Sequence, residues 1–371
     1  MGFSVKNKYD LDTPCLVLDL EVLEKNLQKM QAAADSAGKN LRPHAKTHKC
    51  SSLAKRQIEA GAIGVCAAKV SEAEALVKAG LNEILITGPV VAPGKIKRLV
   101  ELLIKSPSLM TVVDHRDAVA MLSAALKEKG LSMGVLIDID VGLHRTGAKT
   151  ADVLELANYI LSCKNLLLRG IQAYAGHVQH ILSFEERKSA SHNSLNGAVP
   201  IFCKLKADYE SCTIFSASGT GTFDIDLSIP EITELQVGSY ACMDMEYLGI
   251  GSASNSTYFN EFGPALRLLT TVVSANQHGF VTVDAGLKSL YRDGGRPQLV
   301  ESQSLGMQYE WFGDEYGLII CPESGTLPIG TVLELITSHC DPTINLFDKF
   351  YLARGTEVTG IWKIDLRGCS Q

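Results

Sequence analysis

Two patterns of hydrophobic and polar residues divide the chain. From about Glu21 to Tyr240, short apolar segments rich in Val, Ile and Leu alternate with segments of helical periodicity. Within residues 21–34, Leu23, Leu27 and Met30 recur at helical spacing with charged residues between them. This spacing predicts an amphipathic helix.

The apolar segments of this first part predict eight strands, and each but the last is followed by a segment of helical length. The strands are Leu41–Lys46, Gly64–Ala68, Glu83–Thr87, Met110–Val113, Gly134–Asp138, Gly170–Tyr174, Thr213–Ala217 and Glu234–Val237. A strand followed by a helix, repeated at this spacing, is typical of a (β/α)8 barrel of parallel strands. An open doubly wound sheet is the alternative, but the Gly-x-Gly-x-x-Gly turn that usually follows its first strand is absent.

Helical periodicity almost vanishes after about Gly249. The segments that predict strands there are Leu266–Ser274, Gly279–Asp284, Tyr316–Cys321, Thr331–Ser338 and Phe350–Ile364. Leu11–Leu20 is also strand-like and could join either part. We therefore expect the barrel over residues 21–250 and a mostly antiparallel β domain over 251–371, joined by a strand from residues 1–20.

Composition and charge narrow the class of protein. Hydrophobic residues make up 46% and charged residues 20% of the chain, which is typical of a globular protein. The formal net charge is −6 and no basic patch is present, so we expect no nucleic-acid partner. No apolar segment is long enough to span a bilayer, and we expect no membrane partner. The 10 cysteines form no Cys-x-x-Cys pair, which favours a reduced compartment and a cytoplasmic location.

The residues that follow the predicted strands are the first candidates for chemistry, because functional groups of such barrels lie at the carboxyl ends of the strands. The first strand runs into Arg42–Lys49, which includes His44 and Lys46. A lysine held there can lose its charge by desolvation and act as a Schiff-base amine. Lys49 and Lys69 are also candidates, and a surface lysine in a basic turn is the alternative.

A phosphate site is indicated by the segments after the seventh and eighth strands. Glycine amides together with Ser and Thr hydroxyls can form an anion-binding nest, and loops at these positions often bind phosphate. A pair of flexible turns is the alternative. The candidate residues are Ser218, Gly219, Thr220, Gly221, Thr222, Gly238, Ser239 and Tyr240.

A reactive lysine and a phosphate site in one barrel suggest pyridoxal phosphate, which carries an aldehyde and a phosphate. A sugar-phosphate aldolase, whose substrate supplies the phosphate, is the other interpretation. Arg145 could donate to the phenolic oxygen of the cofactor, and Tyr174 and His177 could contact its ring nitrogen or ring face. Each of the three has a structural alternative, as an ion-paired Arg or as a hydrogen-bonded Tyr or His.

A metal site is indicated in the β domain, where Thr331–Ser338 is followed by His339-Cys340-Asp341. In an extended segment, His339 and Asp341 point the same way while Cys340 points oppositely. One imidazole and one carboxylate could hold manganese, magnesium, cobalt or zinc and leave positions for water and substrate. A hydrogen-bonded strand end is the alternative.

In combination, these motifs resemble the D-threonine aldolase family, which is grouped with D-serine dehydratase and alanine racemase among the type III pyridoxal-phosphate enzymes. The resemblance spans nearly the whole chain. The segments that carry it are Arg42–Lys49, Ser218–Thr222, Glu234–Tyr240, Val283–Lys288 and His339–Thr343. It implies an alanine racemase-like fold and a pyridoxal 5'-phosphate cofactor.

The resemblance also implies roles for individual residues. Lys46 would bind the cofactor covalently, Tyr174 would face its pyridine nitrogen and Arg145 its phenolic oxygen, while the loops after the last two strands would hold its phosphate. His339 and Asp341 would bind the metal, with Mn²⁺ the first candidate. The activity implied is metal-activated cleavage of D-threonine and related D-β-hydroxy-α-amino acids to glycine and an aldehyde, by a homodimer.

Two catalytic roles are predicted on less direct grounds. Metal-bound hydroxide or His44 would remove the proton of the substrate hydroxyl. Relatives tend to carry an acidic pair followed by His-Gly, whereas this chain has Asp314-Glu315-Tyr316-Gly317. We include Asp314 as a residue that would help position substrate or a metal-bound water.

Other activities of the same family stay open. A dehydratase acting on D-serine or D-3-hydroxyaspartate is the nearest, but the dehydratase relatives carry Cys where this chain has Asp341. A 3-hydroxy-D-aspartate aldolase, a racemase that needs no metal, and a non-catalytic pyridoxal-phosphate carrier are the others. Carriers resemble the barrel alone, so the additional β domain argues against that last alternative.

Overall fold

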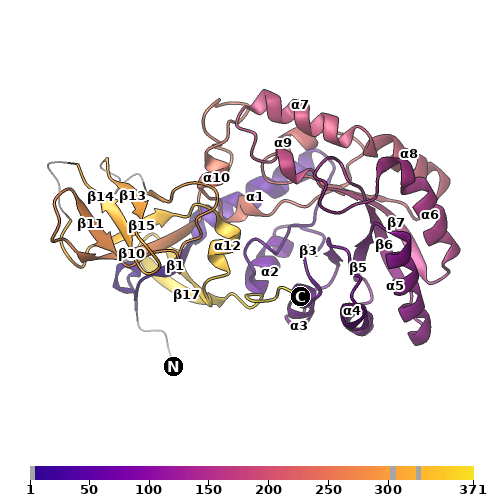
Figure 1. The fold of residues 1–371 in the computed structure, drawn as a ribbon, viewed down its shortest axis with the longest axis horizontal. Coiled ribbons are helices and arrows are strands. Elements are labelled where there is room, and N and C mark those ends of the chain that lie inside the picture. The colour runs from indigo at the N-terminus through magenta and orange to yellow at the C-terminus, as the bar shows by residue number, and fades with distance from the viewer. Residues whose placement is uncertain (1–4, 301–305, 323–326) are drawn as a thin grey trace. The chain divides into compact units, whose positions relative to one another are not determined.

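The computed structural model describes residues 5–300, 306–322 and 327–371, so the start of the predicted strand segment 1–20 lies outside the described residues. The chain divides into two compact units (Figure 1). We call the unit that contains the parallel strands the barrel unit and the other the β unit. The barrel unit comprises Lys29–Lys46, Leu53–Gly238 and Gly368–Gln371, and the β unit comprises Met1–Gln28, Thr47–Ser52 and Ser239–Arg367.

Eight parallel strands form the centre of the barrel unit, in the order β2-β9-β8-β7-β6-β5-β4-β3. A parallel bridge between His44 and Cys66 joins the two ends of this order and closes the ring. The strands are β2 (Asn40–Leu41), β3 (Val65–Ala67), β4 (Ile84–Ile86), β5 (Met110–Val113), β6 (Met133–Asp138), β7 (Leu166–Ala173), β8 (Ile214–Ala217) and β9 (Glu234–Leu235). All eight overlap predicted strands, although β2 shares only Leu41 with the predicted strand Leu41–Lys46, and the (β/α)8 barrel is confirmed.

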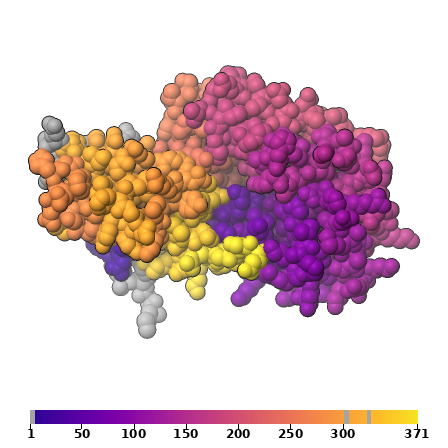
Figure 2. Space-filling model, viewed as in Figure 1, coloured from indigo at the N-terminus to yellow at the C-terminus, as the bar shows by residue number. Residues whose placement is uncertain are grey.

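Helices follow the barrel strands along the chain and lie outside them (Figure 1). They are α2 (Ser51–Glu59), α3 (Val70–Lys78), α4 (Pro93–Lys105), α5 (Arg116–Lys129), α6 (Val153–Ser162), α7 (Phe184–Leu195), α8 (Ala198–Asp208) and α9 (Phe223–Asp226). A further helix, α1 (Leu20–Ser36), precedes β2 in the chain. The predicted amphipathic helix is α1, and Leu23, Leu27 and Met30 are all buried. On the face drawn in Figure 2, the later segments of the barrel unit, which include α7 and α8, are magenta, and its earlier segments are purple.

Local capping explains where a typical barrel helix begins and ends. The His115 side chain accepts a hydrogen bond from the amide of Asp117 at the start of α5. At its end, Gly130 adopts the left-handed conformation with φ 65°, which glycine takes without a steric penalty. Between the strands, an apolar cluster that includes Leu85, Val112 and Leu136 fills part of the barrel core.

The β unit is built on one mostly antiparallel sheet in which β1 (Cys15–Asp19) takes part. β1 pairs antiparallel with β10 (Leu266–Ser274) and parallel with β16 (Lys349–Arg354). The other strands are β11 (Phe280–Val283), β12 (Gln298–Leu299), β13 (Gln308–Trp311), β14 (Gly317–Ile320), β15 (Val332–Ile336) and β17 (Glu357–Lys363). Two short helices, α10 (Met245–Leu248) and α12 (Cys340–Ile344), accompany the sheet.

Two details of the predicted β domain are wrong. The segment Phe350–Ile364 is not one strand but the antiparallel hairpin of β16 and β17, which reverses at Gly355 with φ 57°. β12 and β13 were not predicted at all. Within the described ranges, no helix has both the length and the apolar composition needed to cross a bilayer.

Candidate active site

The barrel brings several predicted site residues to one end of its strands. His44 and Lys46 follow β2, Tyr174 follows β7, and Arg145 lies in the loop after β6. Lys46 is half-buried in a turn that is tied to β3, because the amide of the preceding Ala45 donates to the carbonyl of Cys66 at 2.9 Å. The turn therefore holds the lysine at the carboxyl end of the strands, as the barrel geometry predicts.

His44 is buried, and both of its ring nitrogens have partners in the barrel unit. Nδ1 accepts from the backbone amide of Lys46 at 3.4 Å, and Nε2 lies 3.0 Å from Oγ1 of Thr87. Since an amide can only donate, Nδ1 carries the lone pair and Nε2 carries the proton. The Thr87 hydroxyl in turn donates to the carbonyl of Ala67 at 3.3 Å. A neutral imidazole with its basic nitrogen beside the Lys46 turn is the result.

Arg145 and Tyr174 lie together beside a small hollow after β6 and β7. The guanidinium carbon of Arg145 is 6.0 Å from the centroid of the Tyr174 ring, within the range of a cation–π contact. Both side chains line the hollow with Asp138, Thr146 and Gln172 among others. The two residues that follow Arg145 are held by hydrogen bonds. The Thr146 hydroxyl donates to Asp138 at 2.9 Å, and the Gly147 amide donates to Asp114 at 3.1 Å.

Asp138, the last residue of β6, is a site residue that was not predicted. It is 5% exposed, and burial raises its pKa to about 6 even though hydrogen bonds from Gln172 and Thr146 favour the charged form. The Gln172 amide donates to Asp138 at 2.8 Å, and Gln236 donates to Gln172 at 2.9 Å and to Ser216 at 2.8 Å. A connected polar network therefore lies at the carboxyl ends of β6, β7, β8 and β9.

The loop after β8, predicted to bind phosphate, is largely organised by hydrogen bonds within the barrel unit. The Gln179 side chain accepts from the Gly221 amide at 3.0 Å and donates to the Thr222 hydroxyl at 3.0 Å. That hydroxyl donates to Asp226 at 2.5 Å, and burial raises the pKa of this carboxyl. Arg187 of α7, whose side chain is fully buried, donates to the Gly221 carbonyl at 2.6 Å.

These hydrogen bonds reduce the number of groups in the loop that could bind a phosphate. The Gly221 amide is committed to Gln179, the Thr222 hydroxyl hydrogen to Asp226, and the Thr222 amide donates to the Gly219 carbonyl at 3.2 Å. The other three loop residues, Ser218, Gly219 and Thr220, are all buried, and the Ser218 hydroxyl donates to the Gly219 carbonyl at 3.4 Å. Gly221 is explained by packing, because a Cβ there would lie 2.1 Å from the backbone oxygen of Gln179.

The remaining residues predicted for the phosphate lie at the boundary between the two units. Gly238 ends the barrel unit, while Ser239 and Tyr240 begin the following 3₁₀ helix of the β unit, η4 (Ser239–Ala241). Both side chains are buried, and the Tyr240 ring packs edge-to-face against Phe262 at 5.7 Å between centroids.

His177 and Asp314 lie in settings that differ from those of the other predicted residues. His177 is exposed, its Nε2 is 3.3 Å from the hydroxyl of Ser194 on α7, and it does not line the Arg145–Tyr174 hollow. Asp314 is exposed in the loop between β13 and β14. Its carbonyl accepts from the amide of Lys288 at 2.9 Å, so this loop packs on the Val283–Lys288 motif within the β unit.

The predicted extended conformation of the metal pair is wrong beyond His339. His339 is extended, with φ −140° and ψ 121°, but it is the N-cap of α12, and Asp341 lies in the first turn of that helix. The segment turns helical because Pro342 is tolerated in a first turn and a buried carboxylate caps the helix from outside. That carboxylate is Asp244, whose Oδ2 accepts from the Cys340 amide at 2.8 Å.

Asp244 links the two short helices of the β unit. Its Oδ1 accepts from the Tyr247 amide at 3.1 Å and so caps α10, while Oδ2 caps α12. Its side chain is 0% exposed, and burial raises its pKa, an effect that the two amides partly offset. A single buried group therefore sets the position of α10 relative to His339 and Asp341.

The His339 ring is surrounded by carboxylates. Its Nδ1 lies 3.5 Å from Oε2 of Glu246 and 3.4 Å from Oδ2 of Asp293. Nδ1 is buried and makes no hydrogen bond to any group in the described part of the chain. Over residues 5–300, 306–322 and 327–371, no three His, Cys, Asp or Glu side chains come together as a metal cluster. The predicted site therefore rests on the pair His339 and Asp341.

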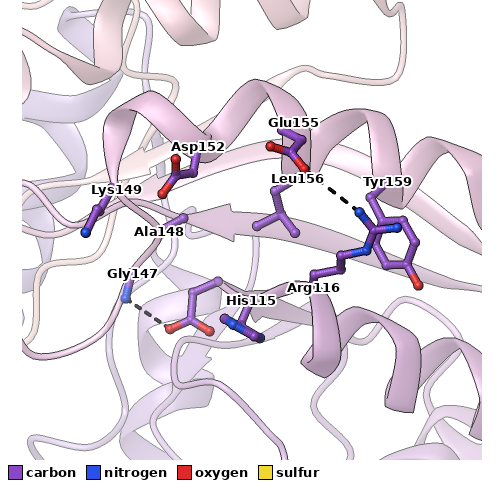
Figure 3. Close-up of a pocket in the computed structure, with 10 residues that line it drawn as sticks. His115, Arg116, Gly147, Ala148, Lys149, Asp152, Glu155, Leu156 and Tyr159 are labelled. Carbon is purple, nitrogen blue, oxygen red and sulfur yellow. Dashed lines mark hydrogen bonds and ion pairs between the residues drawn. The ribbon is translucent and has the colours of Figure 1, made fainter.

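A separate cavity of about 360 Å³ lies in the barrel unit between the end of β5, the loop after β6 and the start of α6 (Figure 3). None of the predicted site residues lines it. Arg116 lies 3.9 Å from Glu155 and stacks at 4.1 Å over the Tyr159 ring (Figure 3). Asp114 accepts from the backbone amide of Gly147 at 3.1 Å.

Comparison with known proteins covers the whole chain. Residues 18–245 match the family profile of the alanine racemase N-terminal domain, and residues 265–353 match a profile of a serine dehydratase domain. The chain is 38% identical to a D-threonine aldolase of Arthrobacter sp, over 97% of this chain and 94% of that protein. It is 36% identical to a 3-hydroxy-D-aspartate aldolase of Paracoccus denitrificans, over 97% and 93%. The crystal structure of a D-threonine aldolase from Filomicrobium marinum superposes with a TM-score of 0.93 at 35% identity, covering 100% and 99% of the two chains.

Proposed function

The chain belongs to the D-threonine aldolase family, with an alanine racemase N-terminal domain, and from this membership we propose that it is a pyridoxal-phosphate-dependent carbon–carbon lyase. Its reaction would be the cleavage of D-threonine and related D-β-hydroxy-α-amino acids to glycine and an aldehyde. The relatives with 38% and 36% identity are named as aldolases acting on D-threonine and on 3-hydroxy-D-aspartate, and they support this substrate class.

The observation that carries the proposal is the arrangement at the carboxyl end of the barrel strands. A half-buried lysine, Lys46, follows β2, and the Arg145–Tyr174 pair lines a hollow after β6 and β7. An amine, a guanidinium donor and an aromatic face are the groups that pyridoxal phosphate needs from a protein. The donor set of the barrel unit therefore fits this cofactor.

When bound, pyridoxal phosphate supplies an electron sink for the electrons of the broken Cα–Cβ bond. Lys46 would hold the cofactor through its amine, Arg145 would donate to the phenolic oxygen, and Tyr174 would face the pyridine nitrogen. Ser218, Gly219 and Thr220, with Gly238, Ser239 and Tyr240, would hold the phosphate.

His44 is our candidate for removing the proton of the substrate hydroxyl. Its Nδ1 carries the lone pair and accepts the long 3.4 Å contact from the Lys46 amide, while Nε2 lies 3.0 Å from the Thr87 hydroxyl. Protonation at Nδ1 would place the charge beside the Lys46 turn. Asp314 stays a proposal for positioning the substrate.

The β unit would supply a divalent metal through His339 and Asp341. The buried Nδ1 of His339 faces carboxylates, so Nε2 would be the nitrogen that binds the metal. An imidazole together with a carboxylate oxygen suits Mn²⁺ as well as Mg²⁺, Co²⁺ or Zn²⁺. The metal, when bound, lowers the pKa of a coordinated hydroxyl. We propose Mn²⁺ as the native ion.

A dehydratase is the second candidate, and the serine dehydratase profile over residues 265–353 favours it. Asp341 supports the aldolase instead, because a hard carboxylate ligand replaces the thiolate that dehydratase relatives carry. We also propose a homodimer and a cytoplasmic location. The location is supported by the 10 cysteines, all of which are free thiols.

Product analysis tests the proposed function. Purified protein is incubated with D-threonine in the presence of Mn²⁺ or of a chelator, and glycine and acetaldehyde are assayed against ammonia and 2-oxobutyrate. Metal-dependent glycine and acetaldehyde are expected. Ammonia and 2-oxobutyrate would identify a dehydratase, and no turnover of any D-amino acid with bound cofactor would favour a carrier.

A further inference from the structure

Glu246 has no role in the proposed chemistry, yet it faces the imidazole of a candidate metal ligand. Its Oε2 lies 3.5 Å from Nδ1 of His339, and both side chains are largely buried, at 22% and 23% exposed. A ligating histidine usually donates its other ring N–H to a carboxylate, which fixes the tautomer and orients the ring. Glu246 occupies the place of that carboxylate.

Backbone bonds hold Glu246 in this position. The amides of Met245 and Glu246 donate to the carbonyls of Thr337 and Ser338, at 3.0 and 3.2 Å. These carbonyls belong to the two residues directly before His339. The start of α10 is therefore attached to the segment that carries the candidate ligand.

Asp244 strengthens the same arrangement. It caps α10 through one oxygen and α12 through the other. The helix that carries Glu246 and the helix that carries Asp341 are thus fixed to one buried group. Movement of the α10 backbone relative to α12 would require breaking at least one of these caps.

Asp293 is the competing carboxylate, since its Oδ2 lies 3.4 Å from the same nitrogen. Its side chain is 65% exposed, so water screens its charge and competes for its oxygens. The more buried Glu246 is therefore the stronger partner of Nδ1, although its distance is slightly longer.

We propose that Glu246 is a positioning residue for the metal site: its carboxylate lies 3.5 Å from Nδ1 of His339, a charge contact without a hydrogen bond, and would accept the Nδ1–H once His339 binds the metal through Nε2. This inference rests on the proposed metal site at His339 and Asp341. It concerns the affinity for the metal and makes no claim about a step of the reaction.

Titration of the chelator-treated holoenzyme with Mn²⁺, followed by electron paramagnetic resonance of the free ion, tests the inference. Glu246→Ala should weaken Mn²⁺ binding about 10- to 100-fold, the range for loss of such a partner. Glu246→Gln keeps an acceptor oxygen without the charge and should lose less. Asp293→Ala is the matched control and should change the affinity less than about threefold. The cofactor absorbance and melting temperature of each variant report whether the fold is intact.

The outcomes separate this inference from the proposed metal site. If Glu246→Ala binds Mn²⁺ as the parent does while His339→Ala loses binding, the site stands and the role of Glu246 is refuted. If His339→Ala also binds Mn²⁺ normally, the proposed site itself is wrong, and the inference falls with it. A loss in Asp293→Ala that exceeds the loss in Glu246→Ala would assign the positioning role to Asp293 and overturn the proposal.

Discussion

Replacing Asp138 with Asn tests whether burial at the end of β6 disfavours the charged form of the Asp138 carboxylate. The side chain is 5% exposed and lies in the hollow that Arg145 and Tyr174 also line. Burial raises its pKa to about 6 from the ordinary value of 3.8. Asn keeps the shape and the acceptor for Gln172 but cannot become charged.

The magnitude follows from this pKa difference. Each pKa unit corresponds to about 1.4 kcal/mol, so ionising Asp138 costs the folded state roughly 3 kcal/mol relative to the unfolded chain. Because the folded pKa is the higher one, the protonated group contributes this stability fully below the unfolded pKa of 3.8, and the contribution is lost as the pH rises through about 6. About 2 of the 3 kcal/mol fall between roughly pH 4.5 and pH 7.5.

The assay compares urea unfolding of the parent and Asp138→Asn at several pH values, with equal cofactor content. The free energy of unfolding of the variant minus that of the parent should increase by about 2 kcal/mol across this range, whatever constant offset the substitution brings. In ¹³C spectra of protein labelled at the aspartate carboxyl carbons, a resonance titrating near pH 6 should be absent from the variant. A difference in unfolding free energy that stays constant with pH would refute the argument.

Three further predictions test other parts of the account. Lys46→Ala should abolish turnover and the visible absorbance of bound cofactor, and full activity with an unchanged spectrum would exclude Lys46. Gly221→Ala should lower the free energy of unfolding in urea by at least about 2 kcal/mol, because the added Cβ would lie 2.1 Å from the backbone oxygen of Gln179. The control Gly94→Ala, with nothing within 4 Å of its added Cβ, should not lower it. Equal losses of unfolding free energy in the two variants would contradict the packing argument. Asp341→Cys should shift metal preference in calorimetric titrations from Mn²⁺ toward Zn²⁺, because a thiolate is a softer ligand, and an unchanged preference would remove Asp341 from the metal site.

The barrel strands could be predicted because strands buried on both faces appear as continuous apolar segments. Ile84–Ile86, for example, are all 0% exposed, and their sequence contains no polar residue. β13 (Gln308–Trp311) could not be found in this way. Its residues are polar or aromatic and only Tyr309 is fully buried, so the segment has no apolar run.

Residues of the candidate site could be predicted only where they directly follow the carboxyl ends of predicted strands. Arg145 and Tyr174 follow β6 and β7, and the structure brings them together. The importance of Asp138 depends on its burial and on a hydrogen bond from Gln172, which is distant in sequence, and a pattern of residue types reports neither. The partners that occupy the β8 loop come from the segment around Gln179 for the same reason.

The pair His339 and Asp341 shows how the start of a helix changes the side-chain directions that a strand pattern predicts. Alternation along a strand predicts that His339 and Asp341 share a face, but α12 begins directly after His339. Pro342 was the available signal, since proline is favoured in the first turn of a helix. The cap from Asp244, nearly a hundred residues earlier, could not be seen without the fold.

The central claim is that this protein breaks a bond between Cα and Cβ of a D-amino acid, and the reverse reaction tests it most directly. An enzyme that catalyses the cleavage must also catalyse the condensation of glycine with acetaldehyde. Chiral chromatography of that mixture, incubated with the protein and Mn²⁺, should show D-threonine or D-allothreonine accumulating and no L-isomer. If the protein forms no threonine while it releases ammonia from D-threonine, or if the product has the L configuration, the account is contradicted.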